Sequence, residues 1–262
     1  MRKIFAAIYF FYRWLIFAPL LGIVTAICGF LAVSISMIGY PELASWFAGT
    51  IWGRVIAVLT PMFVTVKGRD KIQPGQSYIV VANHPSAYDI FIIYGWLGID
   101  FKWVIKKEAR KFPILGISCE KMRHIFVDRS NTEAAVRSLE EAKDRIKDGV
   151  SVMFFPEGTR SPENGGLHNF KKGAFRMAVQ LGLPILPVTI IGTNNVLPPK
   201  SVKLMPGKAK LIFHDPIDIS TVQANDIHKL AVHARDIIAA ALSNSEDSSV
   251  NGVSSKPIAE AL

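Results

Sequence analysis

The chain has 262 residues, enough for one large domain or two small ones. Half of the residues are hydrophobic and the mean hydropathy is +0.29, which is high for a soluble protein and indicates membrane contact. The 30 Lys and Arg residues outnumber the 21 Asp and Glu residues, so the charge of +9 favours anionic partners such as phospholipid headgroups. Two cysteines, Cys28 and Cys119, are too few for a disulfide framework or a zinc cluster, and they fit a reducing compartment.

The N-terminal segment, residues 1–62, predicts membrane-anchoring helices. No charged residue occurs over Trp14–Ile38, and a helix of that length spans a hydrocarbon core of about 30 Å. Arg2, Lys3 and Arg13 precede it among aromatic residues, as is typical of a cytoplasmic membrane interface. A cleaved signal peptide is the alternative, but its apolar region should be only about 7–15 residues long.

A second apolar stretch, Leu43–Met62, follows Pro41 and Glu42 and contains Arg54. A charge in the middle of a membrane costs about 2.5–3.5 kcal/mol on insertion scales. We therefore expect a membrane-embedded helical hairpin, or a second helix near the interface, instead of a second clean span. Such a pair keeps the basic N-terminus and the basic remainder of the chain on the cytoplasmic side.

Residues 63–242 alternate apolar strands with helices and predict one further domain. The expected strands are Phe63–Gly68, Ser77–Asn83, Phe101–Ile105, His124–Arg129, Ser151–Phe155, Pro184–Ile191 and Lys208–Phe213. The expected helices are Tyr88–Leu97, one from the capping box Ser130–Glu133 to Gly149, Lys171–Leu181 and Ile227–Leu242. This order indicates an α/β fold with a mixed, largely parallel central sheet flanked by helices. The Ser- and Asn-rich residues 243–262 are expected to form a disordered tail.

A histidine and an aspartate stand close together where the second expected strand ends. His84 follows the run Tyr78–Asn83, and Pro85 and Ser86 favour a sharp exit, so Asp89 lies about one turn inside the next helix. An aspartate there can accept a hydrogen bond from one imidazole nitrogen and leave the other free to take a proton. The spacing indicates a general base with its orienting partner. The alternative is structural, with a turn-capping histidine and an aspartate that is only a helix N-terminal charge.

Two further loops offer charged side chains directly after strands. The stretch Phe155–Ser161 (FPEGTRS) includes Arg160, whose planar fork of donors suits a phosphate. Lys106 and Lys107 follow another strand and could meet the same charge. An ordinary turn with a surface ion pair and a solvated charge run are the alternatives for these loops. The apolar stretch Ile185–Gly192 is expected to form a wall.

Four sequence blocks occur in a characteristic order: NHPSAYD from Asn83, KKEARKFPILG from Lys106, FPEGTRS from Phe155 and LPVTIIG from Leu186. Their order and placement resemble the four motif blocks of the glycerolipid acyltransferase family, above all its bacterial 1-acyl-sn-glycerol-3-phosphate acyltransferases. The resemblance extends over Phe63–Phe213. It is specific because a His-x4-Asp motif is paired with Phe-Pro-Glu-Gly-Thr-Arg.

The resemblance implies acyl transfer from a thioester, either acyl-CoA or acyl-carrier protein, to the sn-2 hydroxyl of 1-acyl-glycerol 3-phosphate (lysophosphatidic acid), giving phosphatidic acid without an acyl-enzyme. It implies that His84 is the general base and Asp89 its partner. The residues that it implies for binding the glycerol phosphate are Glu157, Gly158, Thr159, Arg160, Lys106 and Lys107, with Arg129 and Lys172 (in FKKGAF) as weaker candidates. No metal and no bound cofactor are expected, because His228 and His233 are spaced i, i+5 without the glutamate of a zinc helix, and no Gly-x-x-x-x-Gly-Lys or Gly-x-Gly-x-x-Gly loop occurs. The acyl donor is a co-substrate.

The expected partners are lysophosphatidic acid, the acyl donor and membrane phospholipids, with the catalytic domain on the cytoplasmic face of a membrane (the inner membrane in a bacterium). An acyltransferase for glycerol 3-phosphate or another lysophospholipid would carry the same motifs. A non-catalytic membrane scaffold is a further alternative, and intact His84, Asp89, Glu157 and Arg160 count against it. A nucleic-acid-binding protein could use the +9 charge, but the membrane segment and the lack of a nucleic-acid module predict no nucleic acid partner.

Overall fold

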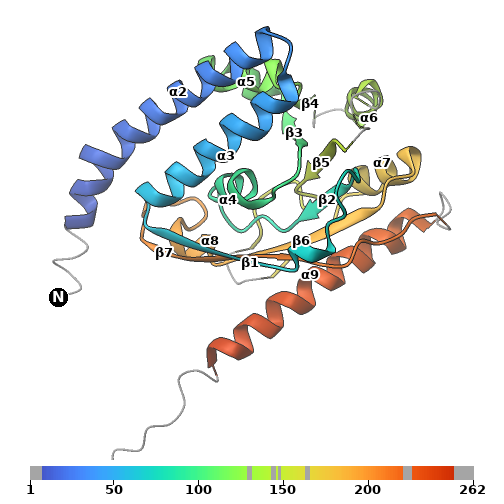
Figure 1. Ribbon diagram of the computed structural model, residues 1–262. Helices are drawn as coiled ribbons and strands as arrows, with labels where there is room; N and C mark the ends of the chain where they lie inside the picture. The colour runs from blue at the N-terminus through green and yellow to red at the C-terminus, as the bar shows by residue number, and fades with distance from the viewer. Residues whose placement is uncertain are drawn as a thin grey trace, which may run out of the picture.

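Seven strands form one mixed sheet at the centre of the computed structural model, which describes residues 8–128, 132–142, 146, 149–162, 166–220 and 226–250 (Figure 1). The strands are β1 Met62–Lys67, β2 Ile79–Ala82, β3 Phe101–Lys106, β4 Ile125–Val127, β5 Ser151–Phe154, β6 Ile185–Ile191 and β7 Gly207–Phe213. Their order is β1-β7-β6-β2-β5-β3-β4, and every neighbouring pair is parallel except β6 with β7. The mixed, largely parallel sheet predicted from the sequence is confirmed.

The central strands are apolar on both faces because helices cover both faces of the sheet. Along β2, Val80 and Ala82 belong to one buried hydrophobic cluster, whereas Ile79 and Val81 belong to another, as the alternation of side chains along a strand requires. The first cluster includes residues of α3 Pro41–Leu59 and α4 Asp89–Trp96, and the second packs with α6 Thr132–Glu141, α7 Gly173–Leu181 and α9 Ile227–Val250 (Figure 1). The domain is therefore a three-layer arrangement with the sheet in the middle.

The N-terminal helices form the expected hairpin. A π-helical segment, η1 Tyr12–Phe17, continues into α2 Ala18–Met37, and a short turn leads back into α3, which packs along α2 (Figure 1). Among the described helices, only Ile8–Met37 is long and apolar enough to cross a membrane, with a mean hydropathy of 2.4. The second arm does not qualify, in keeping with the charge of Arg54 within it.

Small residues let the hairpin lie very close to the rest of the protein. A Cβ at Gly53 of α3 would lie 2.4 Å from the carbonyl oxygen of Phe91 in α4. A Cβ at Gly49 would lie 2.2 Å from the ring of Tyr94, so both positions require glycine. Hairpin and sheet residues also share one hydrophobic cluster. The boundary predicted after residue 62 consequently does not separate two independent cores.

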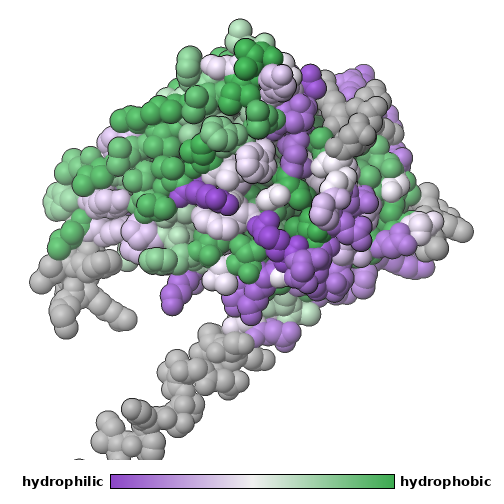
Figure 2. Space-filling view, in the orientation of Figure 1, coloured by the Kyte–Doolittle hydropathy of each residue, from purple (hydrophilic) through white to green (hydrophobic). Residues whose placement is uncertain are grey.

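The outer surface of the hairpin is apolar. Most of the large hydrophobic side chains that are exposed lie in residues 8–58, and α5 Pro113–Lys121, which packs on α2, adds Ile114, Leu115 and Ile117. Figure 2 shows this apolar surface gathered over the helices at the top and left of the molecule, apart from a more hydrophilic region. An apolar surface of this extent marks a membrane or protein contact, and next to a helix of spanning length it indicates membrane association.

Most predicted strands and helices match the structure within a few residues, with three differences. The helices α5 and α8 Thr193–Val196 were not predicted. The last helix continues to Val250, so the predicted tail does not begin at Ser243, because Leu242 still packs on the sheet and the Ser243 hydroxyl bonds within the helix. The helix predicted to reach Gly149 ends as α6 at Glu141. The capping residues Ser130 and Asn131 lie outside the described residues.

Candidate active site

The imidazole and the carboxylate predicted from their spacing are in contact. His84 lies just beyond β2, Asp89 begins α4, and the turn between them brings His84 Nδ1 to 2.7 Å from Asp89 Oδ2. The same oxygen accepts a hydrogen bond from the Ser86 N–H at 2.9 Å. Because a carboxylate only accepts, Nδ1 is the donor in this pair, and the pair leaves Nε2 unused. The local chain geometry thus orients the imidazole ring.

The carboxylate is shielded from water while the ring is not. The Asp89 side chain is fully buried, whereas the His84 side chain is 16% exposed. Burial raises the pKa of Asp89, and the hydrogen bond and charge of His84 oppose that rise. The Thr193 hydroxyl also lowers the pKa of Asp89. Thr193 Oγ1 and Asp89 Oδ1 are both buried, and neither makes a hydrogen bond of good geometry with a described residue.

The loop after β5 holds His84 by its backbone and by its ring. The His84 N–H donates to Glu157 Oε1 at 3.0 Å, and the Ser161 N–H donates to the His84 carbonyl at 2.8 Å. Glu157 is 3% exposed, and its second oxygen accepts from the His168 N–H at 2.9 Å. The Phe155 ring stacks on the imidazole with centroids 4.0 Å apart and an interplanar angle of 6°. These contacts restrict the ring to one position.

His84 faces a hollow of about 770 Å³, here called the cationic hollow, at the carboxyl ends of β2, β3 and β5. Lys106 at the end of β3, Arg160 after β5 and Lys200 between α8 and β7 line it, together with Phe155, Gly158, Thr159, Ser161, Pro162, His168 and Pro199. None of the three cations has a hydrogen bond or ion pair with a described residue, so their charges are available to a ligand. The hollow therefore favours an anion. No group of three His, Cys, Asp or Glu side chains suited to a metal ion occurs in the described part of the chain.

Comparisons with known proteins connect this geometry to a family. A family model described as Acyltransferase matches residues 63–191. A 1-acyl-sn-glycerol-3-phosphate acyltransferase from Saccharomyces cerevisiae is 30% identical over 215 residues, which cover 80% of this chain and 71% of that protein. The chain belongs to the acyltransferase family. The resemblance inferred from the four motif blocks is confirmed.

Two further relatives of this acyltransferase show how far the similarity extends. The crystal structure of PlsC, the 1-acyl-sn-glycerophosphate (LPA) acyltransferase of Thermotoga maritima, is 28% identical and has a TM-score of 0.77. The match covers 94% of this chain and 98% of that one, so it includes the helical hairpin. A 1-acyl-sn-glycerol-3-phosphate acyltransferase from Chlamydomonas reinhardtii is 34% identical over 178 residues, or 67% of this chain and 52% of that protein. The chain thus spans about half the length of that relative.

The acyltransferase brings most predicted site residues together. The cationic hollow contains His84, Lys106, Gly158, Thr159 and Arg160, with Asp89 behind the ring. Lys107 instead forms an ion pair with Asp128 and does not line the hollow. Lys172 is exposed at the start of α7 and does not line it either. Its neighbour Lys171 lies against the loop, since a Cβ at Gly158 would be 2.7 Å from Lys171 Nζ.

Glu157 differs most from its predicted place. Its carboxylate faces inward and accepts hydrogen bonds from the His84 N–H, the Ser161 hydroxyl and the His168 N–H. A buried carboxylate needs such donors, because burial without them is costly. Glu157 therefore orders the loop around His84, and it is not among the residues that line the cationic hollow. Arg129 lies outside the described residues.

Lys200 lines the cationic hollow and was not predicted from the sequence. Its loop is tied to the active-site turn by the Ser86 hydroxyl, which donates to the Leu197 carbonyl at 2.7 Å. Lys200 has a φ of 55°, a left-handed conformation that is uncommon for lysine. The pair Pro198 and Pro199 signals a turn in the sequence, but it does not reveal that the turn returns to His84.

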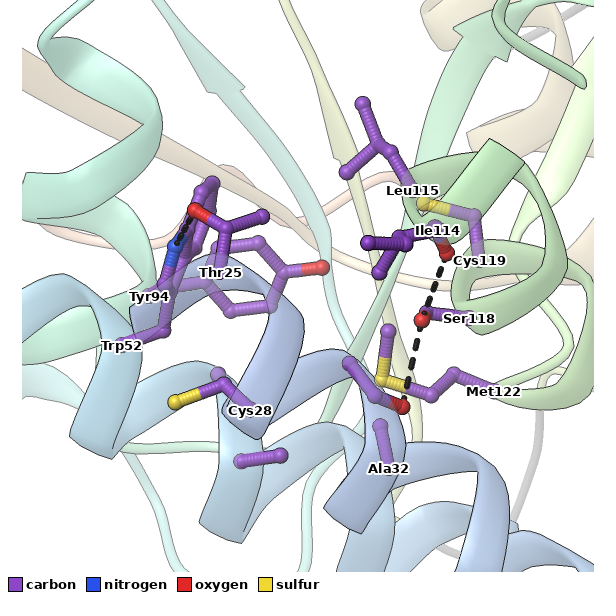
Figure 3. Close-up of a pocket in the computed structure, with 13 residues that line it drawn as sticks. Thr25, Cys28, Ala32, Trp52, Tyr94, Ile114, Leu115, Ser118, Cys119 and Met122 are labelled. Atoms are coloured by element: carbon purple, nitrogen blue, oxygen red, sulfur yellow. Dashed lines mark hydrogen bonds between the residues drawn. The ribbon is translucent and has the colours of Figure 1, made fainter. Parts of the chain in front are cut away.

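A separate apolar cavity of about 50 Å³ lies where α2, α3 and α5 meet (Figure 3). Cys28, Ser118 and Cys119 line this cavity and do not line the cationic hollow. Burial raises the pKa of the Cys119 thiol to about 12, and the Ser118 hydroxyl donates to the Ile114 carbonyl at 2.8 Å. Neither group is therefore placed or activated as a nucleophile beside His84. The cavity is smaller than the ~150 Å³ apolar cavity that admits benzene.

Proposed function

We propose that this acyltransferase transfers an acyl chain from an acyl thioester, acyl-CoA or acyl-carrier protein, to the 2-hydroxyl of 1-acyl-glycerol 3-phosphate, forming phosphatidic acid. The observation that supports this most strongly is the joint lining of one hollow by His84, Lys106 and Arg160. The named activities of the relatives from S. cerevisiae and T. maritima support the choice of acceptor.

The cationic hollow suits the phosphate of this acceptor. The guanidinium of Arg160 can donate two parallel hydrogen bonds to phosphate oxygens, and Lys106 and Lys200 add point charges. The phosphate and the free hydroxyl of the acceptor belong to the same small glycerol unit. A phosphate held by these cations therefore presents the hydroxyl to the imidazole of His84.

His84 acts as the general base through Nε2. Its Nδ1 proton is held by Asp89, so Nε2 takes the hydroxyl proton while the acceptor oxygen bonds to the thioester carbonyl carbon. The carboxylate stabilises the imidazolium that forms. When the C–S bond breaks, the imidazolium returns the proton to the departing thiolate. This route needs no acyl-enzyme, in agreement with the remote positions of Ser118 and Cys119.

We infer that the protein lies on the cytoplasmic face of a membrane. The apolar helix Ile8–Met37 and the exposed apolar surface of the hairpin would occupy the lipid, where the acceptor also resides. A net charge of +9 favours an acidic, lipid-covered surface. The cationic hollow would then receive the headgroup of a lipid that remains in the bilayer.

An acceptor and donor panel tests this function. Purified protein in lipid vesicles is offered lysophosphatidic acid, glycerol 3-phosphate or lysophosphatidylcholine, each with labelled acyl-CoA or acyl-carrier protein, and the lipid products are identified by mass spectrometry. We expect phosphatidic acid from lysophosphatidic acid and much less product from the other acceptors. His84→Ala protein at equal concentration is the control. Product from another acceptor alone would show that the assignment of the acceptor is wrong.

A further inference from the structure

A second hollow, of about 370 Å³, adjoins the cationic hollow. The two share a wall made of Ser161, Pro162 and Pro199. Asn83 and Pro85, the neighbours of His84 in the sequence, line the second hollow, whereas His84 itself lines the first. The base therefore stands at the junction of two spaces, and binding the acceptor accounts for only one of them.

The second hollow is built on a rigid floor. The Asn83 side chain is 1% exposed and bonds to both backbone groups of Ile190, through Nδ2 to the carbonyl and through Oδ1 from the N–H, each at 2.8 Å. These bonds lock the ends of β2 and β6 together. Gly192 then turns the chain with a φ of 88°, and a Cβ there would lie 2.3 Å from the Lys208 carbonyl oxygen. The turn fixes the start of α8, which carries Asn194 and Asn195.

The chemistry of the second hollow differs from that of the first. Of the described residues that line it, none carries a formal charge. The side-chain amides of Asn194 and Asn195 have no hydrogen-bond partner among the described residues, and they line the same hollow as Ile191 and Leu242. An anion would lose its hydration here without gaining a cation, so a phosphate is disfavoured. The lining suits an uncharged ligand with both amide and apolar parts.

We propose that the second hollow binds the pantetheine arm of the acyl donor, an inference that rests on the thioester donor of the proposed function. This arm is uncharged and contains two amides, a hydroxyl and short apolar segments. Its amides can exchange hydrogen bonds with Asn194 and Asn195, and its carbon atoms can pack on Ile191 and Leu242. Coenzyme A and acyl-carrier protein carry the same arm, so the hollow recognises what the two donors share.

This placement puts the two substrates on opposite sides of the base. The acceptor hydroxyl reaches His84 from the cationic hollow, and the thioester carbonyl reaches the same point past Ser161 and Pro199. The acceptor oxygen bonds to the carbonyl carbon, and the C–S bond breaks. The proton passes from the hydroxyl through His84 to the thiolate, and the free thiol leaves with its arm.

Steady-state kinetics with Asn195→Trp tests the proposal. Asn195 is exposed, so the protein can fold with an indole that fills the hollow. We expect the KM for the carrier-linked donor to rise about tenfold and the KM for lysophosphatidic acid to stay unchanged. An acyl N-acetylcysteamine thioester, which lacks most of the arm, should show no such rise. Gln180→Trp, exposed on α7 and outside both hollows, is the matched control.

The assay is run with acyl-CoA and with acyl-carrier protein to identify which of them supplies the arm. The KM of Asn195→Trp must rise for the donor that the wild type uses. An unchanged donor KM, or a raised KM for lysophosphatidic acid alone, overturns the proposal. Free pantetheine provides a readout that needs no turnover, and it should bind the wild type but not Asn195→Trp. Phosphatidic acid synthesis without pantetheine binding refutes this inference alone. Asn195-dependent pantetheine binding by a protein that acylates no acceptor refutes only the proposed function.

Discussion

Two histidines of this acyltransferase, His84 and His124, are each held by hydrogen bonds next to a strand, yet their surroundings differ. His84 has one nitrogen on the Asp89 carboxylate, and its other nitrogen has no partner among the described residues. His124 is 3% exposed, and both of its nitrogens are used: Nε2 lies 2.7 Å from the Tyr94 hydroxyl, and Nδ1 accepts from the Trp103 N–H at 3.3 Å.

The difference separates a histidine that can do chemistry from one that supports the fold. Burial, together with the smaller effect of the nearby Lys102 cation, lowers the pKa of His124 to about 3, so this ring stays neutral and bonded. His84 combines an orienting carboxylate with access to a ligand. A bonded imidazole is therefore not enough for catalysis, because one nitrogen must also face the substrate.

Substitution of His84, the less buried of the two histidines, should have the largest effect. In His84→Ala, we expect kcat for phosphatidic acid formation to fall by roughly 10²–10⁴, the usual contribution of general acid–base catalysis. The melting temperature should also fall, because the buried Asp89 carboxylate loses its hydrogen bond from Nδ1 and Phe155 loses its stacking contact, so turnover is compared per folded molecule. Mass-spectrometric product assays with calorimetry on the same samples check both parts. A variant with normal turnover would show that His84 is not the base.

Substitution in the buried cluster around His124 should lower the stability of the protein and leave kcat unchanged. Lys102 is 1% exposed, its Nζ lies 3.5 Å from Asp100 Oδ1, and no hydrogen bond joins them. In Lys102→Met, the carboxylate loses its buried cation, and we expect a loss of about 3 kcal/mol in the free energy of unfolding. The double variant Lys102→Met/Asp100→Asn should recover part of the lost stability, because it also removes the unpaired carboxylate. Denaturant titration measures this loss, and a fall in kcat per folded molecule would contradict a purely structural role.

The lowered pKa of His124 predicts how stability depends on pH. The folded-state pKa of about 3 lies below the unfolded value of 6.5, so the unfolded chain binds the proton first as the pH falls. Keeping His124 neutral therefore contributes to the free energy of unfolding above pH 6.5. As the pH falls from 6.5 toward 3, this contribution is lost at up to ~1.4 kcal/mol per pH unit. His124→Gln should therefore give a shallower pH dependence of the melting temperature. His228→Gln, on the exposed side of α9, is the control and should keep the wild-type slope.

The smallest effect concerns the anion site beside His84. Arg160→Lys keeps the charge and removes the planar fork, so we expect the KM for lysophosphatidic acid to rise about tenfold with little change in kcat. Arg176→Lys, on α7 and outside the cationic hollow, should leave both constants unchanged. If Arg160→Lys behaves like this control, the guanidinium does not hold the phosphate.

Local features of the site were predictable from the sequence. The contact between His84 and Asp89 forms within one tight turn, so their spacing and the intervening Pro85 were sufficient to predict it. The central strands β2, β5 and β6 could be recognised because helices cover both faces of the sheet there and leave these strands almost wholly apolar. The antiparallel pairing of β6 with β7 leaves no comparable trace in the pattern of residues.

Side-chain directions that depend on distant partners were not predictable. Glu157 turns inward because the N–H groups of His84 and His168 are there to donate to it. Lys107 turns away from the hollow because Asp128 attracts it, and Lys200 enters the site only because its loop is tied to the active-site turn. Composition and spacing specify which residues a loop offers, whereas tertiary contacts decide which of them line the hollow.

The central claim is that His84 and the cations of the hollow act on one acceptor molecule. A crystal structure of the protein with glycerol 3-phosphate, the headgroup of the proposed acceptor, tests it most directly. The account predicts the phosphate on Arg160 and Lys106, with the 2-hydroxyl about 3 Å from His84 Nε2. A phosphate bound outside the cationic hollow, or a hydroxyl directed away from the imidazole, would contradict it.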